Sequence, residues 1–178
     1  MPLEEPKITR AEGRGVQLRY ARPADAREIA RITKPYIERK ILVDKQLITY
    51  FEDIQEFIVA EKDGEVVACG ALHVLWDDIA EVRTLAVSDA VRGQGIGSLI
   101  LEALIERARY LELERIFCLT FEVDFFARHG FEAFEGMAVG VDVYEKMLNT
   151  HDDGVREFLE LASVKPNTLG NTRMLLQL

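Results

Sequence analysis

The apolar positions in the first half of the chain recur mostly with the two-residue period of a β-strand. The strands predicted in this way cover residues 16–21, 57–61, 66–74 and 79–87. Asp63 and Gly64 stand between the second and third of them, and this dipeptide is a strong signal for a hairpin turn. We therefore expect an antiparallel meander over much of the first half.

Helices are predicted between the first two strands. Pro23 and Asp25 stand where first-turn prolines and helix caps occur, and apolar residues follow them at helical spacing. Pro35 has no amide hydrogen to donate, so we expect it to interrupt this helix or to restart it. A second helical stretch is predicted from about residue 46 to residue 53.

The second half of the chain changes to helical spacing. A long helix is predicted to begin at Gly95 or Gly97 and to reach about residue 113, with one apolar face. The later predictions are a strand at 116–120, a helix at 123–128 ended by Gly130, a short strand at 131–134, helices at 142–148 and 154–162, and a strand at 174–178. This order predicts an α/β (α+β) domain with a mixed sheet.

Length and composition favour one soluble domain. The chain has 178 residues, of which 48% are hydrophobic and 30% are charged. It has no run of about 18 apolar residues that could span a membrane. Residues 1–14 are polar and lack the apolar stretch of a signal peptide. We expect a flexible tail over residues 1–14, a single domain over residues 15–178, and a cytoplasmic protein.

The net charge of −9 disfavours nucleic acid as a partner, because nucleic-acid binding needs a basic footprint. To bind an anionic ligand, the protein would need local cations or backbone N–H groups that overcome the repulsion of its negative net charge. Cys69 and Cys118 lie in apolar strand-like runs and are expected to be buried thiols. The three histidines are scattered and no CxxC or HxxxH spacing occurs, so we expect no metal site.

A glycine-rich loop separates the strand at 79–87 from the long helix. Its sequence is Arg92-Gly93-Gln94-Gly95-Ile96-Gly97-Ser98. Glycines let backbone N–H groups converge on a ligand, and a helix N-terminus adds unpaired donors and about half a positive charge. The loop therefore predicts a cradle for a diphosphate. It lacks the Lys of a P-loop, and its GxGxG spacing fits the dinucleotide-binding GxGxxG badly. A flexible glycine turn is the remaining alternative.

Two motifs together resemble the GNAT superfamily of acetyltransferases. Arg92-x-x-Gly95-x-Gly97 matches that family's [R/Q]xxGx[G/A] pyrophosphate loop, between a strand and an amphipathic helix. The aromatic-rich helix followed by Gly-Phe is present at residues 125–131. The resemblance implies a mixed, mostly antiparallel central sheet, flanked by helices and splayed between its two central strands.

The same resemblance implies acetyl-CoA as co-substrate, without a metal. In GNAT enzymes the strand before the loop bonds the pantetheine arm through its backbone, which here means Leu85, Ala86 and Val87. The amides that would hold the pyrophosphate belong to Arg92, Gly93, Gln94, Gly95, Ile96, Gly97 and Ser98. The acetyl group would lie where the strands at 79–87 and 116–120 splay apart.

Over residues 16 to 178 the sequence also resembles the short N-acetylglutamate synthases that lack an amino-acid-kinase domain. The matching stretches are residues 40–43, 69–73, 80–87, 119–122, 125–131 and 164–176. The last stretch is unusual for a generic GNAT domain. The resemblance implies acetyl transfer to the α-amino group of glutamate in the first step of arginine biosynthesis, with feedback inhibition by arginine. Sheet edges and the apolar residues 174–176 need cover, which favours a homodimer.

The implied mechanism is direct attack of the amine on the thioester, for which a base must first remove a proton. Glu81 matches the family's carboxylate at this place, and a solvated strand-edge acid is the alternative. A backbone N–H near Leu85 or Ala86 would stabilise the thioester oxygen. Many GNAT enzymes protonate the leaving thiolate with a Tyr, but Phe126 stands at that position. Thr120 on the neighbouring strand is the replacement we predict.

A glutamate acceptor brings two carboxylates, so its pocket should offer cationic or N–H partners. The candidates are Lys40, Lys45, Arg83, Thr84, Thr172 and Arg173. Longer synthases have an Arg where this chain has Asp44, and another where it has Gly170. Glutamine, which lacks the side-chain charge, is therefore an alternative acceptor. Each cation taken singly could also be a solvated surface charge.

Two other functions remain open. A GNAT enzyme for a polyamine, an antibiotic or a protein N-terminus would want an acidic acceptor pocket, which the net charge allows and the cations oppose. A non-catalytic sensor of acyl-CoA or arginine would not need a carboxylate at residue 81. Glu81 therefore favours an enzyme.

Overall fold

The computed structural model describes residues 7–152, 155, 156, 159 and 171–178. The chain falls into two compact units, the first running to Cys118 and including Gln177–Leu178, the second covering Leu119–Leu176. Within these described ranges, no helix is long and apolar enough to cross a membrane. The helix expected at residues 154–162 lies largely outside the described residues.

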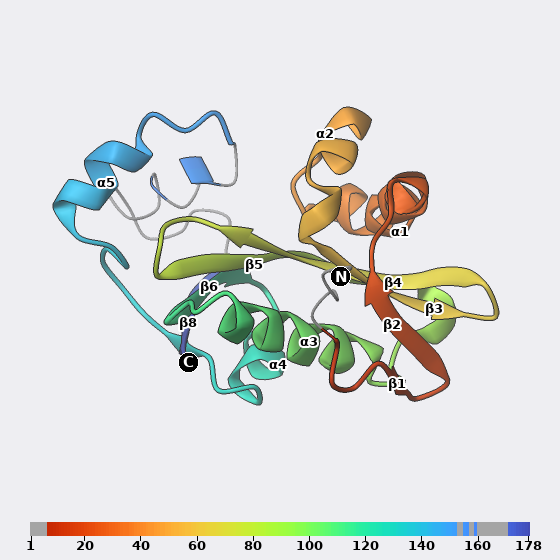
Figure 1. The fold of residues 1–178 in the computed structure, drawn as a ribbon. Helices are drawn as coiled ribbons and strands as arrows, with labels where there is room; N and C mark the ends of the chain where they lie inside the picture. The colour runs from red at the N-terminus through yellow and green to blue at the C-terminus, as the bar shows by residue number, and fades with distance from the viewer. Residues whose placement is uncertain (1–6, 153–154, 157–158, 160–170) are drawn as a thin grey trace, which may run out of the picture. The chain divides into compact units, whose positions relative to one another are not determined.

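The first unit is built on a mixed sheet (Figure 1). Its strands are β1 (Glu12–Gly13), β2 (Val16–Tyr20), β3 (Phe57–Lys62), β4 (Glu65–Val74), β5 (Ile79–Val87) and the first residues of β6 (Arg115–Thr120), in this spatial order. Neighbours from β1 to β5 pair antiparallel, and β5 pairs with β6 in parallel. The antiparallel meander and the mixed sheet are thus confirmed.

Helices cover both faces of this sheet, as Figure 1 shows. Cys69 and Ala71 of β4 belong to the core beneath α1 (Ala26–Glu38) and α2 (Leu47–Glu52). Gly70 between them faces α3 (Ile96–Tyr110), because successive strand residues point to opposite sides.

Pro35 lies inside α1 without interrupting it, so the predicted break is wrong. The proline removes one helical hydrogen bond near the end of the helix, and Arg39 N–H still donates to the Pro35 carbonyl at 3.2 Å. Ile29, Ile32 and Thr33 are buried on the same helix. Their burial stabilises the helix enough to tolerate the lost bond.

Part of the segment that the sequence analysis assigned to a flexible tail over residues 1–14 forms a strand. Glu12–Gly13 form β1 and pair with β2, through a turn in which Arg14 has φ 53° and Gly15 φ 77°. The N–H of Thr9 donates to the Glu106 carboxylate of α3 at 3.0 Å. This strand was not predicted, because two residues are too few to show the two-residue period of a β-strand.

The second unit contains α4 (Val123–Ala127), β7 (Glu132–Ala133), α5 (Val141–Met147) and β8 (Thr172–Gln177). β7 and β8 pair antiparallel, with Ala133 opposite Met174. Gly130 follows α4 with φ 89°, in the role predicted for it. Phe125, Phe126 and Phe131 pack edge to face around this turn. The aromatic Gly-Phe motif therefore serves as the small core of this turn.

Candidate active site

The glycine loop lies between β5 and α3, where the sequence placed it. Gly93 and Gly95 have φ of 79° and 78°, a region that suits glycine, and Gly95 is the N-cap of α3. A Cβ added at Gly93 would meet no atom within 4 Å. The loop thus has an open approach and a helix N-terminus with unpaired N–H groups, which fits an anionic group such as a diphosphate.

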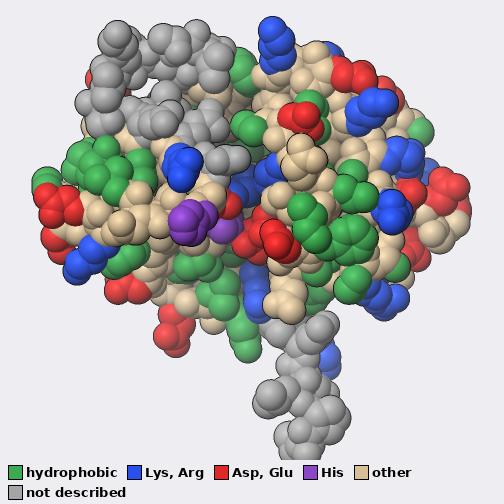
Figure 2. Space-filling view, turned by 90° about the horizontal axis from the view of Figure 1, so that it is seen from above, with side chains coloured by type: hydrophobic (Ala, Val, Ile, Leu, Met, Phe, Trp, Pro, Cys, Tyr) green, Lys and Arg blue, Asp and Glu red, His purple; other side chains and the backbone are tan. Residues whose placement is uncertain are grey.

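Two arginine side chains form a small charged cluster beside the loop. On the face seen in Figure 2, basic side chains are interspersed with acidic ones. Arg92 forms an ion pair with Asp89, and Arg39 lies 4.0 Å from the same carboxylate. Both guanidinium groups lie over the ring of Tyr36, at 5.8 Å and 5.4 Å from its centroid. Tyr36 therefore forms the floor of a small charged cluster beside the loop.

The hydroxyl group of Tyr36 also contacts the last residue of β5. It donates to the carbonyl oxygen of Val87 at 2.7 Å and accepts from the N–H of Val87 at 3.1 Å. Val87 is one of the residues predicted to bind pantetheine through its backbone. A coenzyme that used these groups would have to displace the Tyr36 hydroxyl. This contact was not predictable from the sequence pattern, because 51 residues separate the two positions.

A β-bulge shapes β5 just before this point. Cys69 pairs with Ala86 and Ala71 pairs with Arg83, so three steps on β5 match two on β4. Thr84 lies in the bulge, buried and with φ 56°, and its carbonyl accepts from the Cys69 thiol at 3.5 Å. Arg83 consequently points to the sheet face that α1 and α2 cover.

Glu81 and Arg83 form a buried ion pair on that face. The Nη2 and Nε atoms of Arg83 lie 2.7 Å and 3.2 Å from Oε2 of Glu81. Both side chains are less than a tenth exposed. A carboxylate buried in this way needs a charged partner, and Arg83 supplies one and fixes its orientation.

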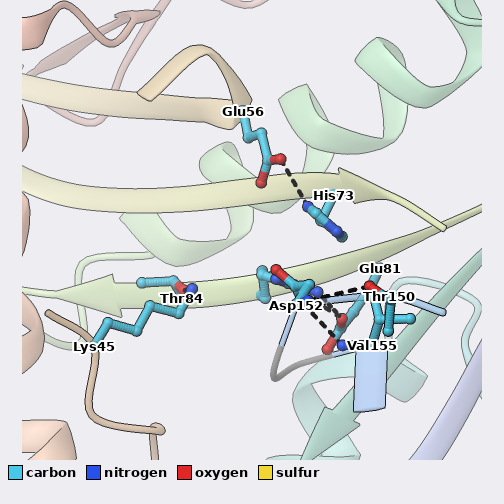
Figure 3. Close-up of polar contacts among 9 residues, drawn as sticks. Lys45, Glu56, His73, Glu81, Thr84, Thr150, Asp152 and Val155 are labelled. Atoms are coloured by element: carbon cyan, nitrogen blue, oxygen red, sulfur yellow. Dashed lines mark hydrogen bonds and ion pairs between the residues drawn. The ribbon is translucent and has the colours of Figure 1, made fainter. Parts of the chain in front are cut away.

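His73 of β4 is the cross-strand partner of Glu81. Its Nδ1 atom lies 2.7 Å from Oε1 of Glu56. Figure 3 shows the His73 ring between Glu56 and the strand that carries Glu81. Sequence reasoning did not single out His73 or Glu56, because their relation depends on strand register.

The segment after α1 brings Lys45 to the bulge. Its Nζ atom lies 3.4 Å from Oγ1 of Thr84 (Figure 3). Lys40, by contrast, is exposed at a turn with φ 58° and donates its N–H to the Ile37 carbonyl at 2.9 Å. Among the predicted acceptor-binding residues, the first unit therefore places Lys45 against Thr84 of β5, and Arg83 precedes Thr84 on the same strand.

The parallel pairing of β5 and β6 covers a short stretch. Ile79 to Glu81 pair with Arg115 to Phe117, while β5 continues to Val87. The pairing therefore covers the beginning of β5, as expected for strands that splay apart.

The remaining predicted residues lie in the second unit. Thr120 accepts a hydrogen bond from the N–H of Glu122 at 2.8 Å, so its oxygen has a structural role and its O–H can still donate. Thr172 and Arg173 begin β8. Arg173 donates to the Gly136 carbonyl and lies 4.5 Å from the Phe134 ring centroid. Burial lowers the pKa of Arg173.

Both cysteines are buried and free, which confirms the prediction. Burial raises the pKa of Cys69 to about 12 and also raises the pKa of Cys118, so neither thiol is set up as a nucleophile. In the part of the chain that the structure describes, no group of His, Cys, Asp and Glu side chains is arranged to hold a metal.

Known proteins are similar to this chain in both sequence and fold. The model of the acetyltransferase (GNAT) family matches residues 24–131. The amino-acid acetyltransferase of Mycobacterium tuberculosis is 51% identical over 164 residues, which cover 90% of this chain and 94% of that protein. An uncharacterized N-acetyltransferase of Chlorobaculum tepidum is 35% identical over 118 residues, which cover 66% of this chain and 76% of that protein.

Solved structures agree with these relatives. A crystal structure from M. tuberculosis, in complex with CoA and a second compound, has a TM-score of 0.85 at 51% identity and covers 90% of this chain and 98% of that one. N-acetylglutamate synthase from Neisseria gonorrhoeae, complexed with coenzyme A and N-acetyl-glutamate, has a TM-score of 0.73 at 24% identity. This chain spans 35% of that longer protein, and at 24% identity the second likeness shows the fold alone.

Proposed function

The chain belongs to the GNAT acetyltransferase family, and from that premise we propose that it acetylates the α-amino group of L-glutamate, giving N-acetylglutamate. The observation that carries the proposal is the buried Glu81 near the beginning of β5, the strand that precedes the glycine loop. The proposed reacting carboxylate then lies on the strand that precedes the proposed coenzyme cradle. The M. tuberculosis amino-acid acetyltransferase, similar over nearly the whole chain, supports an amino acid as acceptor.

Acetyl-CoA supplies the activated acetyl group as a thioester. The amides of residues 92–98 would hold its pyrophosphate, and the backbone of Leu85, Ala86 and Val87 would pair with its pantetheine arm. The positive φ of Gly93 and Gly95 and the open space at Gly93 support this assignment. Val87 would then exchange the Tyr36 hydroxyl for the coenzyme.

Glu81 is the proposed general base. The ammonium group of an amino acid cannot attack, so a base must take its proton, directly or through water. Arg83 keeps this carboxylate in one orientation through the contacts at 2.7 Å and 3.2 Å. Arg83 would thus position the base in addition to its proposed role as a partner for an acceptor carboxylate.

Two further groups complete the proposed chemistry. A backbone N–H near Leu85 or Ala86 would donate to the thioester oxygen as negative charge develops there. Thr120 would donate its hydroxyl proton toward the leaving sulfur, since its oxygen already accepts from Glu122 and its hydrogen remains able to turn. Phe126, at the place where many GNAT enzymes have a Tyr, cannot do so.

The acceptor carboxylates would meet cations and hydroxyl groups of this chain. The proposed partners are Lys40, Lys45, Arg83, Thr84, Thr172 and Arg173. Lys45 is the best supported, because its ammonium group lies 3.4 Å from the Thr84 hydroxyl on the strand that carries Glu81. Asp44 and Gly170 stand where longer synthases have Arg, so glutamine is the second candidate acceptor.

The wider setting follows from the same proposal. N-acetylglutamate formation would open arginine biosynthesis in the cytoplasm, with arginine as feedback inhibitor and a homodimer as the working form. The N. gonorrhoeae synthase has also been solved with coenzyme A and L-arginine. Its likeness to this chain is one of fold, and it supports an arginine site only to that extent.

Release of CoA from acetyl-CoA tests the proposed function. The acceptors are glutamate, glutamine, ornithine, spermidine and an aminoglycoside, assayed with the wild type, Glu81→Gln and the exposed control Glu65→Gln. We expect turnover with glutamate, a loss of at least about a hundredfold in kcat for Glu81→Gln, and no change for Glu65→Gln. Turnover only with the polycations would refute the acceptor. Coenzyme binding without turnover would favour a sensor.

A further inference from the structure

The start of β2 and the end of β5 lie at the same edge of the sheet. The register joins Gln17 to Glu61 across β2 and β3, and Ala68 to Val87 across β4 and β5. The Arg14-Gly15 turn directly precedes β2, so it lies at the edge from which the glycine loop leaves β5. Two segments about 80 residues apart therefore meet here, as the contact between Arg14 and Gln94 shows.

Arg14 lies directly against Gly95, the N-cap of α3. A Cβ added to Gly95 would come within 2.7 Å of both Cζ and Nη1 of Arg14. The same Nη1 atom lies 3.3 Å from the Gln94 carbonyl oxygen. The guanidinium group can therefore occupy this position because Gly95 has no side chain.

This is an unfavourable place for a cation on its own. The N-terminus of α3 already carries partial positive charge, which repels a guanidinium group. The other arginines of this segment have carboxylate partners: Arg10 lies 3.5 Å from Glu102, and Arg19 lies 2.7 Å from Asp25. Among the described residues, Arg14 forms no ion pair with a carboxylate. An anion between the guanidinium group and the helix N-terminus would accept hydrogen bonds from both and would remove the repulsion between them.

We propose that Arg14 is a coenzyme-binding residue, whose guanidinium group bonds the pyrophosphate of acetyl-CoA at the loop of residues 92–98. The inference rests on the proposed coenzyme site and adds to it a side chain from the N-terminal segment. Arg14 supplies a charge-assisted bond that the backbone amides cannot, in a protein whose net charge of −9 opposes an anion.

Calorimetric titration of the full chain with CoA, dephospho-CoA and pantetheine tests the proposal, using the wild type, Arg14→Gln and Arg10→Gln. Arg10→Gln is the matched control, because it removes the same charge from the same segment at a residue paired with Glu102. We expect Arg14→Gln to weaken CoA and dephospho-CoA alike by about tenfold, and to leave pantetheine unchanged. Arg14→Lys should recover part of the loss.

Equal affinities of the wild type and Arg14→Gln for CoA would overturn the proposal, as would an equal loss in Arg10→Gln. A loss with CoA but not with dephospho-CoA would move the contact to the 3′-phosphate and overturn the pyrophosphate assignment. If the wild type itself does not bind CoA, the proposed function fails together with this inference. Melting curves of the four proteins verify that each variant is folded.

Discussion

The Tyr36 hydroxyl forms hydrogen bonds with both backbone groups of Val87, at 2.7 Å to the carbonyl oxygen and 3.1 Å from the N–H. A side chain of α1 thus occupies the end of the strand that should receive the pantetheine arm. The same ring carries Arg39 and Arg92 on its faces. The first unit therefore satisfies Val87 internally before any coenzyme arrives.

Tyr36→Phe should tighten coenzyme binding. The variant keeps the ring under the two arginines but removes the hydroxyl that competes for Val87. Because an exchanged hydrogen bond is worth about 1 kcal/mol net, we expect the Kd for CoA to fall about fivefold. Calorimetry measures this directly. A weaker affinity would mean that the hydroxyl assists the coenzyme instead of competing with it.

Lys45→Gln should raise the KM for the amino-acid acceptor. The Lys45 ammonium group lies 3.4 Å from the Thr84 hydroxyl, whereas Lys40 is exposed on a turn. We expect an increase of about tenfold in this KM, with the KM for acetyl-CoA unchanged, since one charged hydrogen bond is lost. Lys40→Gln should have a smaller effect, and the surface control Lys34→Gln none. An unchanged acceptor KM in Lys45→Gln would remove Lys45 from the acceptor site.

Gly70→Ala should destabilise the first unit. A Cβ there would lie 2.7 Å from Cγ2 of Ile100 and 3.0 Å from Cδ1 of Leu104, opposite the bulge of β5. Overpacking of this kind costs about 1–3 kcal/mol in the free energy of unfolding. Gly13→Ala is the control, because its Cβ would meet Leu99 at an ordinary 3.5 Å. Chemical denaturation of the two variants gives the comparison, and equal stabilities would contradict it.

Asp25→Asn should destabilise the protein by about 2 kcal/mol at pH 7, since it leaves the largely buried Arg19 guanidinium group without its main partner. Arg19 lowers the pKa of Asp25, chiefly by donating hydrogen bonds at 2.7 Å and 2.9 Å. A lowered folded-state pKa contributes stability above the unfolded-state value of about 3.9, and this contribution is lost as the pH falls through the folded-state pKa.

Denaturation of the wild type and Asp25→Asn at pH 7 and near pH 3 tests this account. The difference between the two proteins should shrink at the lower pH. The surface variant Glu28→Gln, which breaks an exposed pair with Arg31, should cost less than about 0.5 kcal/mol. A difference that stays constant with pH would contradict the role of the Asp25 charge.

The elements and the glycine loop were predictable because their signals are local. Residues 92–98 carry their own glycines, and the strands before them keep a two-residue period. The contacts of Tyr36 with Val87 and of Arg14 with Gly95 join segments far apart in the chain, so only the folded structure reveals them. The bulge at Thr84 gave no sequence signal either, because a non-glycine residue adopts its positive φ. Pro35 was misjudged because packing outweighed its local preference.

A competition between glutamate and glutamine tests the central claim most directly. Purified protein is given both amino acids at equal concentration with isotopically labelled acetyl-CoA, and the labelled products are counted by mass spectrometry. The product ratio gives the ratio of the two kcat/KM values. We expect labelled N-acetylglutamate to predominate. A predominance of N-acetylglutamine, or the absence of both products while CoA binds, would contradict it.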